Sequence, residues 1–284
     1  MLRTRVITAV LLLLLLAGAA WFDRTALVAV LAFLYGALLF EWLRLCPVPQ
    51  PLALAAGVVA GAGVLAMDAT GMQPGPGLLT GACALASIAW VAIGAMLVRA
   101  QVMPLPGARL PRAFLVASAC LLSIAAWFAM IDAMGRGLAW TLSILALVWL
   151  ADIAAYFTGR AFGRSKLASR ISPGKTWAGV WGALAAVLLV CGFVRWQWPD
   201  LSLWSTQVLR EAPVAGALLI ALFVVLSIVG DLFESLVKRQ AGVKDSGVLL
   251  PGHGGVWDRL DATLPALPLA VLGQWTLAIG WHHA

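Results

Sequence analysis

The chain has 284 residues, of which 63% are hydrophobic and 11% charged, and its mean hydropathy is +0.98. Soluble domains are about half apolar, whereas several runs here reach the roughly 20 apolar residues that cross a hydrocarbon core. These runs exclude a soluble protein, and the alternating segments of a membrane barrel are absent, so we predict an all-α, polytopic integral membrane protein. The formal net charge of +7 is either an orientation signal attracted to anionic lipids or a site for anionic substrates.

The apolar runs predict nine membrane-spanning helices. In chain order these are residues 6–22, 25–42, 51–67, 77–97, 113–131, 137–157, 177–195, 214–232 and 263–281. Lys and Arg favour cytoplasmic loops, and a cytoplasmic N-terminus leaves 4 of the 19 basic residues outside. We therefore expect the N-terminus in the cytoplasm, the C-terminus outside, and a first helix that is not cleaved as a signal peptide.

The two halves of the chain differ in polarity. Residues 1–135, with spans one to five, have short loops, almost no polar group inside a span, and small residues typical of helix packing, as in "AAGVVAGAGVLA". Residues 136–284, with spans six to nine, contain two longer cytoplasmic loops, 158–176 and 233–262. We predict that this second half is catalytic.

Two acidic residues of the second half lie in apolar runs. Asp152 is in "LALVWLADIAAYFTGR" and Asp231 is in "LFVVLSIVGDLFESLVKR", both near the predicted cytoplasmic end. An ionisable residue in a span is costly and by default indicates function. The alternative for each is an acid that reaches the interface or pairs with a cation of a loop.

The first cytoplasmic loop, 158–176, has five cations and no acid. A Walker motif would need glycine at position 169, which is Ser169, so "SPGKT" is not a P-loop. A Pro-Gly turn would place Lys175 and the Thr176 hydroxyl just before a helix. Because an ammonium and a helix N-terminus both favour phosphate, this is either a phosphate site or a capped helix start with orienting cations.

The second loop concentrates charge and glycine. If the eighth span continues past the membrane, Asp231, Ser235 and Lys238 share one helix face, and Glu234 lies close by. If the helix of the ninth span starts early, Asp258 and Asp261 face the same way, because they are three residues apart.

Carboxylates at Asp231, Asp258 and Asp261 can hold a hard cation such as Mg²⁺, which takes oxygen ligands and leaves room for phosphates. The Lys and Arg side chains nearby can bind the remaining phosphate oxygens. The loop thus predicts a phosphoryl or nucleotidyl transfer site. His253 remains open as a metal ligand, a proton carrier, a phosphate contact or an organiser of the loop.

The stretch "SLVKRQAGVKDSGVLLPGHGGVWDRLD", residues 235–261, resembles the signature of the phosphatidate cytidylyltransferases (CDP-diacylglycerol synthases). The fixed positions of that signature are met by Ser235, Lys238, Arg239, Lys244, Asp245, Pro251, His253, Gly254, Gly255, Asp258, Arg259 and Asp261. The upstream segment "ADIAAYFTGRAFGRSKL" with "ISPGKTW" is also similar, although Ala178 stands where the family has Glu or Gln. The motifs cover residues 150–262.

The resemblance implies that CTP and phosphatidate react to give CDP-diacylglycerol and pyrophosphate, with Mg²⁺ neutralising charge. It implies metal ligands at Asp231, Asp258 and Asp261. Candidate catalytic residues are Lys238, Lys244, Asp245, His253 and Arg259. Candidate substrate-binding residues are Lys175, Thr176, Ser235, Arg239, Gly254 and Gly255. Asp245 is either a ligand or the group that orients Lys244.

The resemblance also implies K⁺ as a second cation, a homodimer, and a site that faces the cytoplasm from the inner (plasma) membrane. Expected partners are CTP, phosphatidate and the lipid bilayer, without nucleic acid. One alternative is a cytidylyltransferase or a CTP-dependent kinase that acts on another lipid. A cation-coupled transporter is a further class, although it predicts polar groups near the middle of the bilayer.

Overall fold

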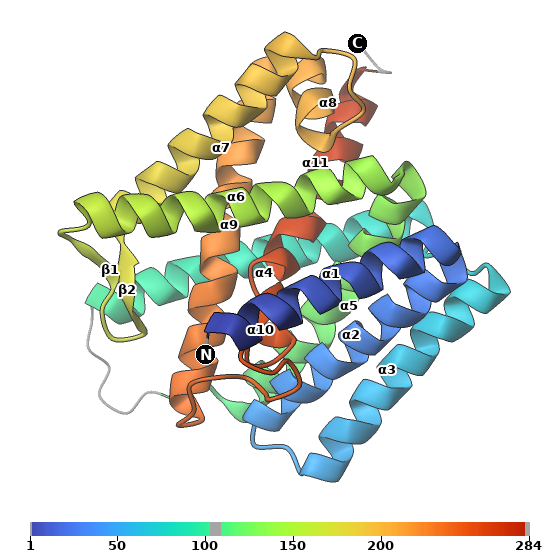
Figure 1. The fold of residues 1–284 in the computed structure, drawn as a ribbon, viewed down its shortest axis with the longest axis vertical. Helices are drawn as coiled ribbons and strands as arrows, with labels where there is room; N and C mark the ends of the chain where they lie inside the picture. The colour runs from blue at the N-terminus through green and yellow to red at the C-terminus, as the bar shows by residue number, and fades with distance from the viewer. Residues whose placement is uncertain (1, 103–108, 282–284) are drawn as a thin grey trace. The chain divides into compact units, whose positions relative to one another are not determined.

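The computed structural model describes residues 2–102 and 109–281, and it is mainly helical (Figure 1). In the described residues the elements are α1 (Leu2–Phe22), α2 (Arg24–Leu45), α3 (Gln50–Thr70), α4 (Pro76–Val102), α5 (Arg112–Arg136), α6 (Leu138–Phe162), β1 (Lys166–Ala168), β2 (Ser172–Thr176), α7 (Trp177–Gln197), α8 (Trp204–Glu211), α9 (Pro213–Gln240), α10 (Trp257–Leu260) and α11 (Thr263–Trp281).

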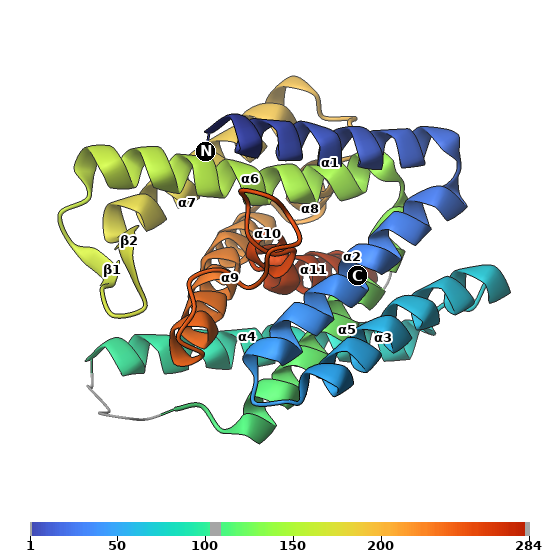
Figure 2. The same cartoon turned by 60° about the horizontal axis from the view of Figure 1, so that its bottom comes forward.

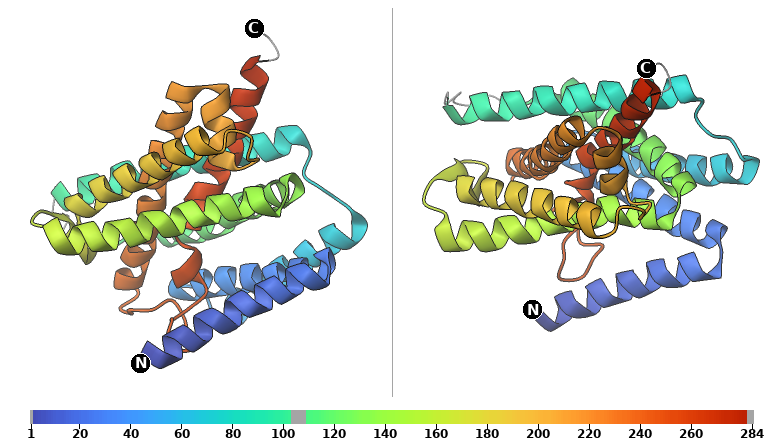
Figure 3. Two further views of the ribbon diagram at one scale, coloured as in Figure 1. Left: turned by 45° about the horizontal axis from the view of Figure 1, so that its top comes forward. Right: turned by 90° about the horizontal axis from the view of Figure 1, so that it is seen from above.

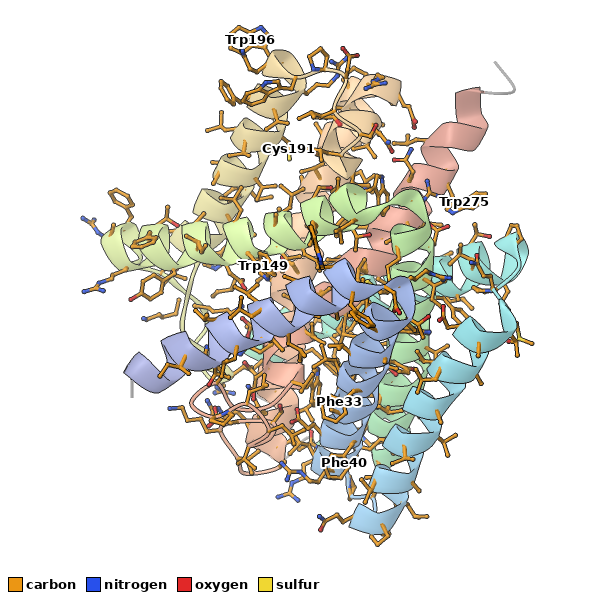
Figure 4. All side chains as sticks on the ribbon, turned by 45° about the vertical axis from the view of Figure 1, so that its right-hand side comes forward. Phe33, Phe40, Trp149, Cys191, Trp196 and Trp275 are labelled. Atoms are coloured by element: carbon orange, nitrogen blue, oxygen red, sulfur yellow. The ribbon has the colours of Figure 1, made fainter. Side chains whose placement is uncertain are left out.

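Seven helices of the described residues are long and apolar enough to cross a membrane, namely α2 to α7 and α9. The protein is therefore a polytopic helical membrane protein. Large apolar side chains remain exposed on these helices, among them Trp149 of α6 and Trp196 of α7, as in lipid-facing residues, and Figure 4 shows Trp196 projecting outward at the end of α7. Helix α1 contains a shorter apolar segment, Val10–Phe22, and α11 coincides with the ninth predicted span. The count of nine stays a prediction.

The chain forms two compact units that alternate along the sequence. Unit 1 comprises Met1–Pro74, Ala108–Ser123 and Val237–Leu260, and unit 2 comprises the segments between and after them. Helix α9 therefore belongs to unit 2 up to Leu236 and to unit 1 from Val237. The predicted boundary after residue 135 separates the N-terminal helices from a catalytic second half. This division stays a prediction.

In unit 1, helices α2 and α3 pack along each other (Figure 1). Gly36 of α2 and Gly57 of α3 lie at the closest approach, where a Cβ on either glycine would collide with the backbone of the other helix. The small residues of "AAGVVAGAGVLA" thus pack helices, as predicted. Helix α10 lies beside α2, as Figure 2 shows, with the loop that connects it to α9.

In unit 2, helices α6 and α7 run side by side and are joined by a hairpin at one end (Figure 3). The antiparallel strands β1 and β2 pair Lys166 with Thr176 and Ala168 with Ser172. The prediction of an all-α fold with an irregular loop over 158–176 is therefore wrong in this segment. Buried Ala168 and Ile171 anchor the hairpin at its turn, which gives the strands an apolar contact that a solvated loop would lack.

The hairpin also corrects the predicted Pro-Gly turn. Residues 172–176, "SPGKT", form β2, and the turn lies at 169–171. The predicted consequence is nevertheless confirmed, because α7 begins at Trp177 directly after Lys175 and Thr176. The Thr176 hydroxyl accepts a hydrogen bond from the Gly179 N–H at 3.1 Å and so caps the helix.

Candidate functional site

Three carboxylates of unit 2 converge near the end of α9. Asp231, Glu234 and Asp261 each offer an oxygen, and these oxygens all lie within 4.8 Å of one another; we call this group the acidic cluster. Asp231 and Glu234 are three residues apart on α9, so they share a face, while Asp261 lies between α10 and α11. Like charges at this separation repel one another unless a cation lies among them, which makes the cluster a fitting site for a hard divalent ion.

The glycine before Asp231 allows this convergence. A Cβ on Gly230 would collide with the carbonyl oxygen of Asp261 and with the ring of Pro265. The backbone of α9 can therefore approach the start of α11 only because residue 230 has no side chain. This close approach brings Asp261 next to the carboxylates of α9.

A cation of the hairpin also reaches the acidic cluster. The Lys175 ammonium lies 2.6 Å from Oδ2 of Asp231, and both side chains are partly exposed. The Ser235 hydroxyl lies 3.4 Å from Oδ1 of the same aspartate, one helical turn away. The structure thus brings together Asp231, Ser235 and Lys175, which the two loops of the sequence had suggested separately.

Burial and the neighbouring charges both affect the carboxyl group of Asp261. Burial raises the pKa of Asp261 well above its ordinary value of 3.8, and the carboxylate of Asp231 raises it further. The Ala262 N–H and the Lys175 ammonium act in the opposite direction, and Asp152 of α6 adds to the increase. Asp152, whose role the sequence left open, therefore contributes negative charge to the cluster. A bound divalent cation would remove this penalty.

The third predicted metal-ligand carboxylate, Asp258, lies in unit 1 and organises the loop between α9 and α10. We call residues 241–256 the signature loop. Oδ1 of Asp258 is 2.5 Å from the Lys238 ammonium, and Oδ2 accepts hydrogen bonds from the backbone N–H groups of Ser246 at 2.8 Å and Gly255 at 2.7 Å. Both oxygens thus have partners inside unit 1.

The three predicted metal ligands therefore fall into two separate groups of contacts. The structure groups Asp231 and Asp261 with Glu234, and it groups Asp258 with Lys238 and the signature loop. Asp258 as a metal ligand stays a prediction. Glu234 was recognised in the sequence only as a neighbour, although its spacing of three from Asp231 on a helix was the signal that it could be a ligand.

The remaining candidates lie on or beside the signature loop. Gly254 has a φ of +84°, which favours glycine, and a Cβ there would collide with Oδ2 of Asp258. The Arg259 guanidinium donates to the backbone carbonyl of His253 at 3.0 Å, which fastens the loop to α10. Lys244 and Asp245 are exposed. Arg239 is also exposed and makes a long contact of 3.4 Å with the Val243 carbonyl.

Sequence reasoning missed a residue of the first half that contacts the signature loop. Glu41 of α2 is 1% exposed, and its Oε2 accepts hydrogen bonds from the Ser246 hydroxyl and the Trp257 N–H, both at 2.9 Å. The signal was present, since Glu41 is an acid inside the predicted span 25–42. The rule that singled out Asp152 and Asp231 would also have singled out Glu41.

Comparison with known proteins supports one family. A sequence model described as "Cytidylyltransferase family" matches residues 3–275. A phosphatidate cytidylyltransferase of Pseudomonas aeruginosa is 38% identical over 291 residues, which cover 99% of each chain. Phosphatidate cytidylyltransferases of Haemophilus influenzae and Brucella suis are 43% and 50% identical over 135 and 133 residues; each match covers 44% of the relative, and they cover 47% and 45% of this chain respectively. The match extends over nearly the whole sequence, and the chain belongs to the cytidylyltransferase family.

Proposed function

We infer that the protein is a phosphatidate cytidylyltransferase, a membrane nucleotidyltransferase that forms CDP-diacylglycerol and pyrophosphate from CTP and phosphatidate. The observation that carries this function is the similarity to the Pseudomonas aeruginosa enzyme over 99% of both chains. The acidic cluster with Lys175 at its edge supplies the chemistry that such a transfer needs: oxygen ligands for a cation and an ammonium for phosphate.

We propose that Asp231 and Asp261 bind Mg²⁺ and that Glu234 contributes a further oxygen. The donor set fits this ion, because all three groups are carboxylates that converge within 4.8 Å. When bound, the ion supplies charge neutralisation at the phosphates of CTP. The signature also predicts Asp258 as a ligand, which would require its Oδ1 to be shared with Lys238.

The reaction forms one bond and breaks another at the α-phosphorus of CTP. An oxygen of the phosphatidate phosphate attacks this phosphorus, the bond to the β-phosphate oxygen breaks, and pyrophosphate leaves. The attacking oxygen is already anionic, so the protein needs no strong general base. The contact of Lys175 with the acidic cluster supports the proposal that it holds a phosphate oxygen there.

We assign phosphate contacts on the signature loop to Lys244, Arg239 and Arg259, whose charged groups are exposed. The resemblance also predicts substrate-binding roles for Gly254 and Gly255, although the space that a Cβ on either residue would need is occupied by Asp258 or Glu41. Lys238 acts through Asp258, since its ammonium is held by that carboxylate.

We propose nine spans with a cytoplasmic N-terminus, an outside C-terminus, and an active site that faces the cytoplasm from the inner membrane. The distribution of Lys and Arg supports this orientation, because it leaves four basic residues outside. A cytoplasmic site gives access to CTP, and a position among membrane helices gives access to the lipid. The family resemblance adds K⁺ as a second cation and a homodimer to the proposal.

The position of the label in CTP tests this function against the alternatives. Purified protein in detergent receives phosphatidate or diacylglycerol, Mg²⁺, and CTP labelled at either the α- or the γ-phosphate. A cytidylyltransferase transfers the α-label to phosphatidate and releases the γ-label as pyrophosphate. Transfer of the γ-label to lipid would instead establish a CTP-dependent lipid kinase, and absence of lipid labelling from folded protein would contradict both.

A further inference from the structure

The end of helix α2 holds the signature loop through three side chains of unit 1. Oε2 of Glu41 accepts from the Ser246 hydroxyl and the Trp257 N–H, each at 2.9 Å. The guanidinium of Arg44 donates to the Ser246 carbonyl at 2.7 Å. The ring of Trp42 stacks on Trp257 with centroids 4.4 Å apart and an interplanar angle of 14°. Ser246 of the signature loop and Trp257, which directly follows the loop, are therefore both held by one turn of α2.

Ser246 links Glu41 to Asp258. Its hydroxyl lies 2.9 Å from Oε2 of Glu41 and 3.0 Å from Oδ2 of Asp258, and Ser246 is fully buried. The same Asp258 oxygen receives the N–H of Gly255. A displacement of Glu41 therefore changes the position of Ser246 and, through it, of Asp258 and the glycines of the loop.

One glycine of the signature leaves room for Glu41. A Cβ on Gly255 would collide with Oε2 of Glu41 and with the Ser246 hydroxyl. The absence of a side chain at position 255 thus serves the contact with α2 as well as the conformation of the loop. A residue of the first half and a residue of the signature are complementary in shape.

The bonds of Glu41 indicate which property of its side chain matters. Both hydrogen bonds end on Oε2, whereas Oε1 is buried and has no hydrogen-bond partner among the described residues. An amide oxygen in place of Oε2 can accept the same two bonds, while a hydrocarbon can accept neither. The geometry therefore requires an acceptor at this point and does not require a charge.

We propose that Glu41 is a positioning residue for the signature loop. It holds the loop in shape by accepting hydrogen bonds from Ser246 and Trp257. This role deepens the proposed function and rests on it, because the loop is the element to which we assign phosphate contacts. Glu41 acts through Ser246 and Asp258. Its contribution is expected in the apparent affinity for CTP more than in the maximal rate.

The kinetic test uses Glu41→Leu, Glu41→Gln and the control Asp68→Asn. Loss of the acceptor leaves buried donors unpaired, so Glu41→Leu raises the KM for CTP by about tenfold. Glu41→Gln keeps both bonds and stays within about threefold of the wild type. Asp68 pairs with Arg24 away from the loop, and its substitution leaves the KM for CTP and the maximal rate unchanged. Ser246→Ala, which removes the hydroxyl bridge, is the second test should the leucine variant not fold, and it also raises the KM for CTP.

A second readout does not depend on turnover. Hydrogen–deuterium exchange of purified protein without nucleotide reports the amides of residues 245–257. Exchange there is expected to be faster in Glu41→Leu and Ser246→Ala than in the wild type and Glu41→Gln. If folded Glu41→Leu has wild-type exchange and a wild-type KM, or if Glu41→Gln fails as the leucine variant does, the proposal is wrong. A wild type without CTP turnover contradicts the proposed function, while the exchange comparison still tests the role of Glu41.

Discussion

The ammonium of Lys175 lies 2.6 Å from Oδ2 of Asp231, so a cation of the β-hairpin already neutralises one side of the acidic cluster. Lys175 lies in a segment without acids, and Asp231 lies within the apolar helix α9, so neither neighbourhood alone identifies the pair. Their contact joins the two parts of the sequence that resemble the family. If the proposed cation binds at the cluster, Lys175 and that cation would share the negative charge of Asp231.

Replacement of Lys175 by methionine tests this sharing of charge. In EDTA, Lys175→Met is expected to lower the unfolding temperature by a few degrees, because the pair is partly exposed and contributes about 1 kcal/mol. Added Mg²⁺ should raise the unfolding temperature of this variant more than that of the wild type. Lys166→Met, an exposed lysine of β1, is the matched control. Equal Mg²⁺ shifts in all three proteins would contradict the account.

The metal assignment predicts loss of turnover when a ligand oxygen loses its charge. Asp231→Asn and Asp261→Asn should each lower turnover at least about 100-fold, because the cation's stabilisation of the transition state is several kcal/mol. Asp132→Asn is the control, since Asp132 is a partly buried, ion-paired carboxylate of the same unit. Full Mg²⁺-dependent turnover in Asp261→Asn would refute its role as a ligand.

Substitutions of Glu234 and of Asp258 are expected to have different effects. Glu234→Gln should raise the Mg²⁺ concentration needed for half-maximal turnover and leave hydrogen exchange of residues 245–257 unchanged. Asp258→Asn should increase exchange in that segment even in EDTA, because Asp258 holds the N–H groups of Ser246 and Gly255. A normal requirement for Mg²⁺ in Glu234→Gln would remove Glu234 from the metal site.

The close approach at Gly230 gives a prediction about backbone packing. Gly230→Ala places a Cβ against the Asp261 carbonyl and Pro265, so it should separate the carboxylates, weaken activation by Mg²⁺ and lower the unfolding temperature. Gly192→Ala in α7 has no atom within 4 Å of the added Cβ and serves as the control. Wild-type Mg²⁺ activation in Gly230→Ala would show that this approach does not position Asp261.

The helices could be predicted well from the sequence because each membrane span is a continuous run of apolar residues. Each of the seven long apolar helices overlaps a predicted span, for example 177–195 within α7. The hairpin was missed because three to five residues per strand give no periodicity, and its stability comes from buried Ala168 and Ile171. The short helix α8 was missed for a similar reason, since buried Trp204 fixes it through a hydrogen bond to the Ala270 carbonyl.

The candidate site was predictable in its residue types and less so in its grouping. Helical spacing related Asp231 to Ser235, and the signature supplied Asp261. The distribution of partners around Asp258 depends on how the signature loop folds back on α10, which periodicity does not describe. Glu41 was overlooked because the first half was interpreted from its small apolar residues, although its contact with Ser246 spans 205 positions of sequence.

Pyrophosphate release is the most direct test of the central claim, that this chain transfers the cytidylyl group of CTP to phosphatidate at a metal site. Protein purified in detergent is given CTP, phosphatidate and Mg²⁺, with parallel samples that lack the lipid or contain EDTA. The account predicts release only when all three are present, together with an equal amount of CDP-diacylglycerol. Release without phosphatidate or in EDTA, or no release from folded protein, would contradict it.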